Sequence, residues 1–157
     1  MAIEVDNLLK IGWVIAEREA IALGAESIEP IHFLLAALKI ADPEFPAQLD
    51  KLDITSEEWK MISEEAMRLR CWLEVLPDHV TDARRRLRYR LARNVGSRAT
   101  VNTLHRSRKT KAAFYDASAM SNDGVLTLRQ VIESMFYLGF VDVSDMRWLG
   151  ETQTVQK

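Results

Sequence analysis

The side chains best suited to chemistry in this sequence are the cations of one basic segment. Residues 84–111 hold eleven Arg or Lys and no Asp or Glu, whereas the rest of the chain carries ten cations and all 23 anions. A guanidinium group forms forked contacts with carboxylate or phosphate oxygens, so this segment predicts an anion-binding surface. Its cations are Arg84, Arg85, Arg86, Arg88, Arg90, Arg93, Arg98, Arg106, Arg108, Lys109 and Lys111.

Three interpretations of this basic segment remain open. It forms a solvated face that the acidic first half neutralises, it docks an acidic protein partner, or it binds nucleic acid through phosphates. The excess of Arg over Lys favours forked contacts over solubility alone. Tyr89 is the only aromatic residue in the segment, which gives little of the base-stacking pattern of single-strand binders.

The remaining reactive side chains do not form a recognisable catalytic or metal-binding pattern. Cys71 has Trp72 beside it and no histidine at helical pairing distance, so we expect a buried structural thiol. His32 lies in an apolar segment and is interpreted as a packed or capping residue. His79 and His105 have no ligands at metal spacing, and no G-x-x-x-x-G-K-[ST] phosphate loop occurs. We therefore expect no enzyme activity, catalytic residue, metal or cofactor.

The elements that position these side chains are predicted to be helices. Apolar residues recur at spacings of three and four, and N-cap, proline and glycine signals separate the periods. This pattern predicts an all-α fold of about seven helices. Thr55-Ser-Glu-Glu58 and Thr127-Leu-Arg-Gln130 read as capping boxes. The expected helices cover about residues 8–22, 30–40, 46–52, 55–77, 81–95, 100–115 and 127–138.

Length and composition indicate one domain in a reducing compartment. The chain has 157 residues, of which 48% are hydrophobic, and a single cysteine. Its acidic start, residues 1–6, is unlike a signal peptide. The longest apolar runs, such as residues 33–38, are shorter than the roughly 18 residues of a membrane helix. We expect a cytoplasmic protein without a membrane partner.

Two segments near the N-terminus carry a family resemblance. Glu19-Ala20-Ile-Ala-Leu23-Gly24 is followed, after three residues, by Ile28-Glu-Pro-Ile-His32-Phe-Leu-Leu-Ala-Ala-Leu38. These segments resemble E-A-x-x-L-G and I-x-x-E-H-L-L-L-A-L-L of the repeat that opens the N-terminal domain of Clp chaperone-ATPases. Ile31 stands where the family has Glu. Residues 48–54 resemble the following family segment, with Asp53 in place of Gly.

A weaker second copy of the same pattern follows about 95–98 residues later. Leu126–Glu133 can be laid on Ile28–Leu35, and Asn102 near Asn7. The resemblance implies a helical bundle of two pseudo-twofold-related repeats, of which the second is degenerate. The expected divisions are repeat one at about 3–76, a basic connection at about 77–99, repeat two at about 100–149 and a polar tail at 150–157.

The resemblance also implies a docking function. Clp N-terminal domains receive substrates and adaptors for an ATP-driven unfoldase, and their loop before the second helix carries partner contacts. The matching positions here are Glu26, Glu29, Pro30 and Ile31, and Arg129 is the second-repeat counterpart of Ile31. Ile31 and Arg129 lack the carboxylate that reads phosphoarginine in some members, so that activity is not expected.

The expected function is non-enzymatic docking of substrate or adaptor proteins for a Clp-type ATPase, fused to this chain or separate. A nucleic-acid-binding helical protein and a stand-alone regulator of a Clp-type complex are the alternatives. Aromatic residues are expected mostly in the core, with one or two lining a groove. The set considered is Trp13, Trp59, Trp72, Phe114, Tyr115, Phe136 and Tyr137.

Overall fold

The protein is mostly helical, as the sequence predicted. A computed structural model describes residues 4–42, 55–73, 80–92 and 104–141. Within these ranges the chain forms six helices and one pair of short strands. In chain order they are β1 (Glu4–Val5), α1 (Asn7–Ala22), α2 (Pro30–Ala41), α4 (Ser56–Leu73), α5 (Val80–Ala92), α6 (Arg108–Met120), β2 (Val125–Leu126) and α7 (Leu128–Tyr137).

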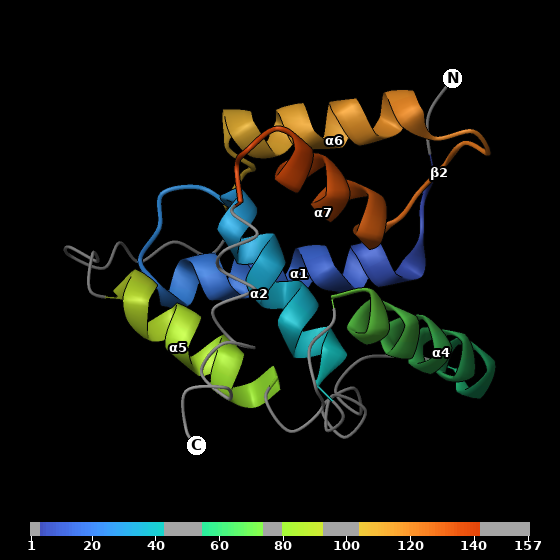
Figure 1. Cartoon of the computed structure of the whole chain (residues 1–157), viewed down its shortest axis with the longest axis horizontal. Coiled ribbons are helices and arrows are strands. Elements are labelled where there is room, and N and C mark those ends of the chain that lie inside the picture. Colours follow the sequence, from blue (N-terminus) through green and yellow to red (C-terminus); the bar gives the residue numbers. More distant parts are fainter. Residues whose placement is uncertain (1–3, 43–54, 74–79, 93–103, 142–157) are drawn as a thin grey trace, which may run out of the picture.

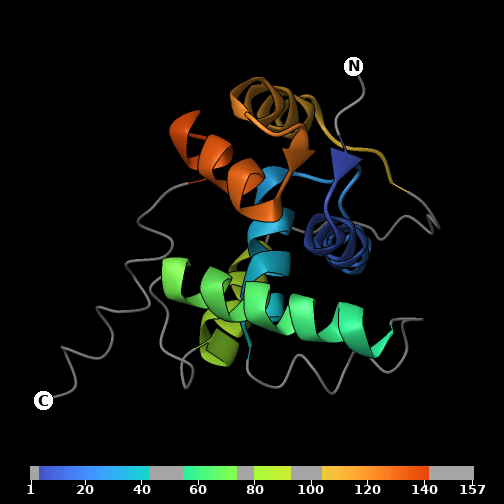
Figure 2. The ribbon, with the colours of Figure 1, turned by 90° about the vertical axis from the view of Figure 1, so that its right-hand side faces the viewer.

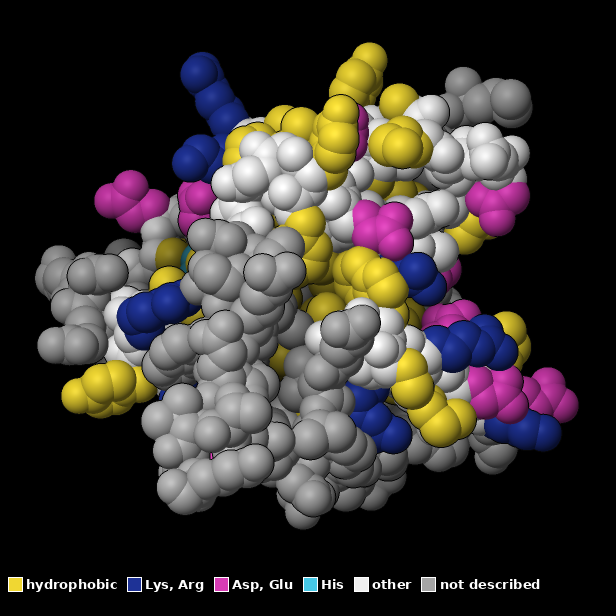
Figure 3. Space-filling view, in the orientation of Figure 1, with side chains coloured by type: hydrophobic (Ala, Val, Ile, Leu, Met, Phe, Trp, Pro, Cys, Tyr) yellow, Lys and Arg dark blue, Asp and Glu magenta, His cyan; other side chains and the backbone are white. Residues whose placement is uncertain are grey.

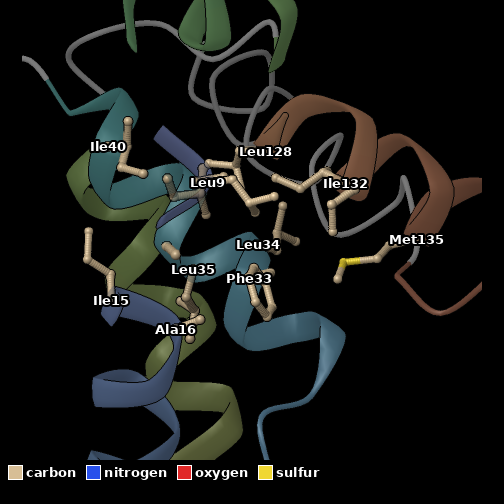
Figure 4. Packing of buried hydrophobic residues seen from close by; sticks show 14 of the residues in the cluster. Leu9, Ile15, Ala16, Phe33, Leu34, Leu35, Ile40, Leu128, Ile132 and Met135 are labelled. Carbon is tan, nitrogen blue, oxygen red and sulfur yellow. The ribbon is translucent and has the colours of Figure 1, made fainter. Parts of the chain in front are cut away.

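Helix α2 lies at the centre and the other helices surround it. It packs against α1, α4, α5 and α7. Figure 2 shows α2 between α6 and α7 on one side and α4 and α5 on the other. Such a position requires a helix that is apolar on nearly all sides. Phe33, Leu34 and Leu35 are completely or almost completely buried, and they meet Leu9 from α1 and Ile132 from α7 in the core (Figure 4).

Local signals explain where the helices begin and end. The Asp6 carboxylate accepts a hydrogen bond from the Leu9 amide at 2.8 Å and caps α1. Pro30 is the first residue of α2, where its missing N–H is harmless. Gly24 and Gly139 follow α1 and α7 with φ near +70°, a conformation that glycine adopts without strain.

Capping by threonine agrees with the sequence prediction at two helix starts. At α7, the Thr127 hydroxyl accepts from the Gln130 amide at 3.1 Å, and Gln130 Oε1 accepts from the Thr127 amide at 3.0 Å. The second predicted capping box is made in part, because Thr55 Oγ1 accepts from the Glu58 amide at 3.3 Å.

The strands join segments that are far apart in the sequence. β1 and β2 are parallel, with Val5 opposite Leu126. A second parallel bridge links Ile28, before α2, to Arg106, before α6. The short strands escaped prediction because two residues are too few to show alternation.

Two sequence predictions are wrong. The helix expected from Thr100 does not include residues 104–107, because α6 begins at Arg108 and Ser107 caps it by accepting from the Thr110 amide at 3.2 Å. Cys71 is exposed rather than buried, since it lies on the outer side of α4.

Several other predictions lie outside the described residues. They concern the helix at 46–52, the cations Arg93 and Arg98, His79 and the polar tail at 150–157.

The central position of α2 gives a direct stability prediction. Replacing Leu34, which is 1% exposed, with alanine removes buried methyl groups and leaves a cavity. The free energy of unfolding should fall by roughly 2–5 kcal/mol. Chemical denaturation measures this loss, with exposed Met61→Ala on α4 as the control that should change little. A loss below about 1 kcal/mol for Leu34→Ala would contradict the burial of α2.

Candidate functional site

The loop before α2 presents one exposed side chain from the predicted docking set. Glu26 is exposed, whereas Pro30 is buried. Ile31 is partly buried and packs against the core. Glu29 is partly buried, and one of its carboxylate oxygens accepts from the Ser27 hydroxyl at 3.0 Å. Of these four positions, therefore, Glu26 has the side chain most open to a partner.

His32 is a capping residue, as the sequence predicted. Its Nδ1 accepts a hydrogen bond from the Glu29 amide at 2.8 Å, which fixes the neutral ring with its proton on Nε2. The side chain is buried, and desolvation lowers the pKa of His32 from 6.5 to about 4. The His32 ring therefore stays neutral near pH 7 and caps the start of α2.

Arg129 lies on α7 with its guanidinium against α4. Its Nε donates to Glu133 Oε1 at 3.0 Å, and its Cζ lies 5.1 Å from the centre of the Trp72 ring. Trp72 also meets Phe136 edge to face, at 6.4 Å between ring centres. Arg129 thus links α4 to α7 while half of its side chain remains exposed.

The folded chain divides the basic segment between two separate faces. α5 lies at one end of the molecule and α6 at the other, with α1 and α2 between them (Figures 1 and 2). Arg85, Arg86, Arg88 and Arg90 are on α5, and all four are exposed. The exposed cations on α6 are Arg108, Lys109 and Lys111.

Arg106 belongs to neither face. Its Cζ lies 4.5 Å from the centre of the Trp13 ring and 4.7 Å from that of Phe114, and burial lowers its pKa. Trp13, Phe33 and Phe114 pack edge to face beneath it. The predicted aromatic core is confirmed for these rings, and Arg106 contributes to packing.

Cations from three helices lie near one another, beside the buried carboxylate of Glu19. Arg88 Nε lies 3.1 Å from Glu19 Oε2, at ion-pair distance but without hydrogen-bond alignment. Burial lowers the pKa of Lys39, and the negative charge of Glu19 opposes that shift. The nearby positive charges of Arg84, Arg88 and Arg18 lower the pKa further. We call Arg18, Lys39, Arg84 and Arg88 the four-cation cluster. Sequence reasoning placed only its α5 members in an anion-binding surface.

The α6/α7 groove is a site that sequence reasoning did not locate. It encloses about 500 Å³ and is lined by Asp116, Ala117, Met120, Gln130, Glu133, Ser134 and Tyr137. Three large hydrophobic side chains at or beside the groove are mostly exposed. Tyr137 on α7 is 82% exposed, and Tyr115 and Met120 on α6 are 79% and 71% exposed. Hydrophobic side chains project from this face of the molecule in Figure 3.

The groove also holds an unusual acidic group. Asp116 Oδ2 is shielded from solvent, and it has no hydrogen-bond partner. Such an oxygen normally has a donor, because burying it unpaired is costly. The helical spacing of Tyr115 and Tyr137 predicted core or groove positions, but no sequence signal joined Asp116 to α7.

The described residues offer no obvious centre for metal chemistry. Among residues 4–42, 55–73, 80–92 and 104–141, no three His, Cys, Asp or Glu side chains come together as metal ligands. In the same ranges no helix is both long enough and apolar enough to cross a bilayer. The candidate sites of the described residues are the α6/α7 groove, the two basic faces and the loop before α2.

Comparison with known proteins gives no relative. No family profile matches the chain, and neither the curated proteins nor the solved structures include a significant match.

The His32 cap predicts a specific pH dependence. Because the folded pKa lies below the unfolded value, the unfolded chain gains the proton first, so stability is full above pH 6.5 and declines towards pH 4. The loss attributable to His32 should approach roughly 2–3 kcal/mol.

His32→Gln is the matched variant for this measurement. Gln130 fills the corresponding place at α7, so glutamine can supply the same acceptor without titrating. Denaturation at pH 7 and pH 4 should give a smaller stability loss for His32→Gln than for the unmodified protein. Equal losses would show that His32 does not carry the effect.

Proposed function

We propose that this chain is a non-enzymatic docking domain that binds substrate or adaptor proteins for a Clp-type ATP-driven unfoldase, in cis or in trans. The proposal joins the sequence resemblance of residues 19–38 to one structural observation. That observation is a reciprocal pattern of hydrogen bonds between the first and last parts of the described chain.

The reciprocal pattern consists of two equivalent bonds. The Asp6 amide donates to the Leu126 carbonyl at 3.0 Å, and the Ser107 amide donates to the Ile28 carbonyl at 3.0 Å. Each donor belongs to the N-cap of a helix, α1 or α6. Each acceptor stands two residues before a helix, α7 or α2. Exchanging α1 with α6 and α2 with α7 therefore exchanges the two bonds.

The caps follow the same exchange. Asp6 and Ser107 each accept from the amide three residues later, and Glu29–His32 corresponds to Thr127–Gln130. α6 has 13 residues and α1 has 16. Because α6 is shorter, the sequence separation between corresponding residues of the two halves is smaller at the starts of α2 and α7 than at the starts of α1 and α6. This pattern supports two pseudo-twofold repeats. In this correspondence Asn7 matches Arg108, whereas the sequence comparison laid Asn7 near Asn102, which lies outside the described residues.

The α6/α7 groove is the docking surface we assign to this function. Its exposed tyrosine and methionine side chains are suited to protein contacts, because aromatic residues and methionine are enriched at interfaces. A groove of about 500 Å³ suits a short segment or loop of a partner better than a flat surface.

Affinity capture tests the function. The tagged full chain should recover a Clp-type ATPase from its native cytosol after nuclease treatment, unless that ATPase is fused to the chain. Met120→Ser with Tyr137→Ser should reduce recovered substrate or adaptor by roughly ten-fold, because a buried anchor often contributes more than 1 kcal/mol.

The control variant removes apolar groups elsewhere. Met61→Ser with Met67→Ser alters two exposed methionines on α4 and should leave capture unchanged. Recovery of nucleic acid alone, lost steeply as salt rises, would overturn the docking proposal. If this chain binds a separate ATPase and blocks the delivery of substrates to it, the chain is a stand-alone regulator.

A second candidate function, an electrostatic dock for an acidic protein partner, is favoured by the four-cation cluster. The four cations lie near one another with the Glu19 carboxylate beside them, and Arg84 is partly buried. A partner carboxylate would supply the negative charge that these neighbouring cations attract.

The cluster predicts a selective effect within α5. Arg84→Gln should weaken binding of a polyglutamate peptide by roughly ten-fold in fluorescence anisotropy, because it removes a partly desolvated charged contact. Arg85→Gln removes the same charge from an exposed position of the same helix and should cost much less. Equal effects of the two variants would show that the cluster acts only as a nonspecific positive surface.

A further inference from the structure

We infer that the α6/α7 groove binds an amphipathic helix of the partner protein, seated there as α5 is seated on α1 and α2. This inference rests on the proposed docking function and its two repeats, and it specifies the form of what is docked. It is carried by the positions that the two repeats share and by a difference in their exposure.

The first step is the correspondence between the helix pair α1/α2 and the helix pair α6/α7. The exchange that relates their caps sets the first residue of α1 against that of α6, and the first residue of α2 against that of α7. Carried along the helices, it pairs buried residues with buried residues in the shared core. Such pairs are Gly12 with Ala113, Ala16 with Ala117, Phe33 with Val131, and Leu34 with Ile132.

The second step is the place of α5 in the first repeat. α5 packs against α2, and Arg88 Nε on α5 lies 3.1 Å from Glu19 Oε2 on α1. Arg88 also lies near Lys39 of α2. Ile15 and Leu35 stand one helical turn before Glu19 and Lys39, on the same faces of their helices. We call the face that holds these four residues of α1 and α2 the α5 seat.

The third step is that the groove occupies the corresponding face of the second repeat. Four of its lining residues stand at the positions of the α5 seat. Asp116, Met120, Glu133 and Tyr137 correspond to Ile15, Glu19, Leu35 and Lys39, in that order. The groove is therefore the second repeat's version of a surface that already binds a helix in the first.

The fourth step is the difference in exposure between the two faces. Glu19 is 6% exposed beside α5, whereas Met120 at the corresponding position is 71% exposed. Leu35 is completely buried, whereas Glu133 is exposed. Among the residues that the structure describes, the second repeat thus presents this face without a helix covering it.

The shape of the groove suits a helix better than an extended segment. Ala117 and Ser134 line it and are small and buried, and small residues at a contact let a second helix approach closely. A helix also satisfies its own backbone hydrogen bonds, whereas an extended segment would find few partners on walls formed by two helices. The exposed side chains of Met120 and Tyr137 can then pack on an apolar stripe of that helix.

The order of polar and apolar residues is exchanged between the two faces. In the α5 seat an apolar pair precedes a charged pair by one turn, whereas in the groove the acidic pair Asp116 and Glu133 precedes Met120 and Tyr137. The partner helix is therefore expected to place apolar side chains against Met120 and Tyr137, and neutral or basic ones against the acids. Helix α5 of a second copy fits less well, because Arg88 would meet the apolar pair.

Peptide titration into the full chain, followed by NMR, tests the inference. The probe is a capped peptide of about 16 alanine, glutamine and lysine residues with leucines at i, i+4 and i+7, which lie on one helix face. A second peptide has the same composition with its leucines on different faces, and a third carries a central proline that breaks the helix. At about 1 mM, the first peptide should shift the amide signals of Ala117, Ser134 and Tyr137, and the others should bind roughly five-fold more weakly.

Two matched substitutions of methionine locate the binding site. Met120→Gln removes an apolar contact from the groove and should weaken binding of the first peptide roughly five-fold. Met61→Gln makes the same change on α4 and should leave binding unchanged. Both methionines are mostly exposed, so both variants should keep their fold, which the dispersion of the amide spectrum reports.

The outcomes separate this inference from the docking function. Equal binding of the three peptides, or no effect of Met120→Gln on a folded protein, overturns the helix inference. Absence of groove shifts with every peptide also overturns it, and groove signals that change with protein concentration alone would overturn it in favour of a second copy. Capture of a Clp-type ATPase stands independently of these results. Selective binding of the helical peptide without any captured ATPase, substrate or adaptor would support the helix inference and overturn the docking function.

Discussion

Burial of α2 is the constraint on which the rest of the structure depends. Ten of its twelve residues are buried, including Phe33, Leu34 and Leu38. A helix that is apolar on nearly every side needs partners on every side, and α1, α4, α5 and α7 provide them. Large buried side chains each contribute roughly 1.5–3 kcal/mol, so the packing around α2 exceeds any single polar contact in the protein.

The close contact of α1 and α7 beside α2 depends on a residue without a side chain. A Cβ atom on Gly12 would lie 3.2 Å from both terminal methyl carbons of Leu128. Glycine costs roughly 1 kcal/mol relative to alanine inside a helix. At this position that cost is offset by packing, because a larger residue would push α7 away from the core.

The sequence was sufficient for features that depend on nearby residues. The Thr127 cap, Pro30 at a helix start and Gly139 at a helix end are each determined within a few positions. The start of α6 was misplaced because Thr100 and Ser107 are both good caps, and the pairing of Arg106 with Ile28 decides between them. No local signal carries that information.

The candidate sites show the same limit. The basic segment is continuous in sequence, but its helices diverge, Arg106 stacks on Trp13 and Phe114, and the α5 face gains Arg18 and Lys39 from other helices. The α6/α7 groove joins Asp116 to Tyr137, which have no recognisable spacing relationship. Residue types thus indicated the available chemistry, whereas tertiary packing determined which side chains share a site.

The reciprocal strand pairing also bears on how the chain folds as it is made. β1 leaves the ribosome well before its partner β2, which begins at Val125. The backbone of Ile28 likewise cannot pair with Arg106 until that residue has been made. Helices α1 and α2 can form early from local contacts, but their leading backbone segments stay unpaired until the second half emerges. Completion of the fold is therefore expected to wait for synthesis of the second half, and the nascent first half is the form most exposed to chaperones and proteases.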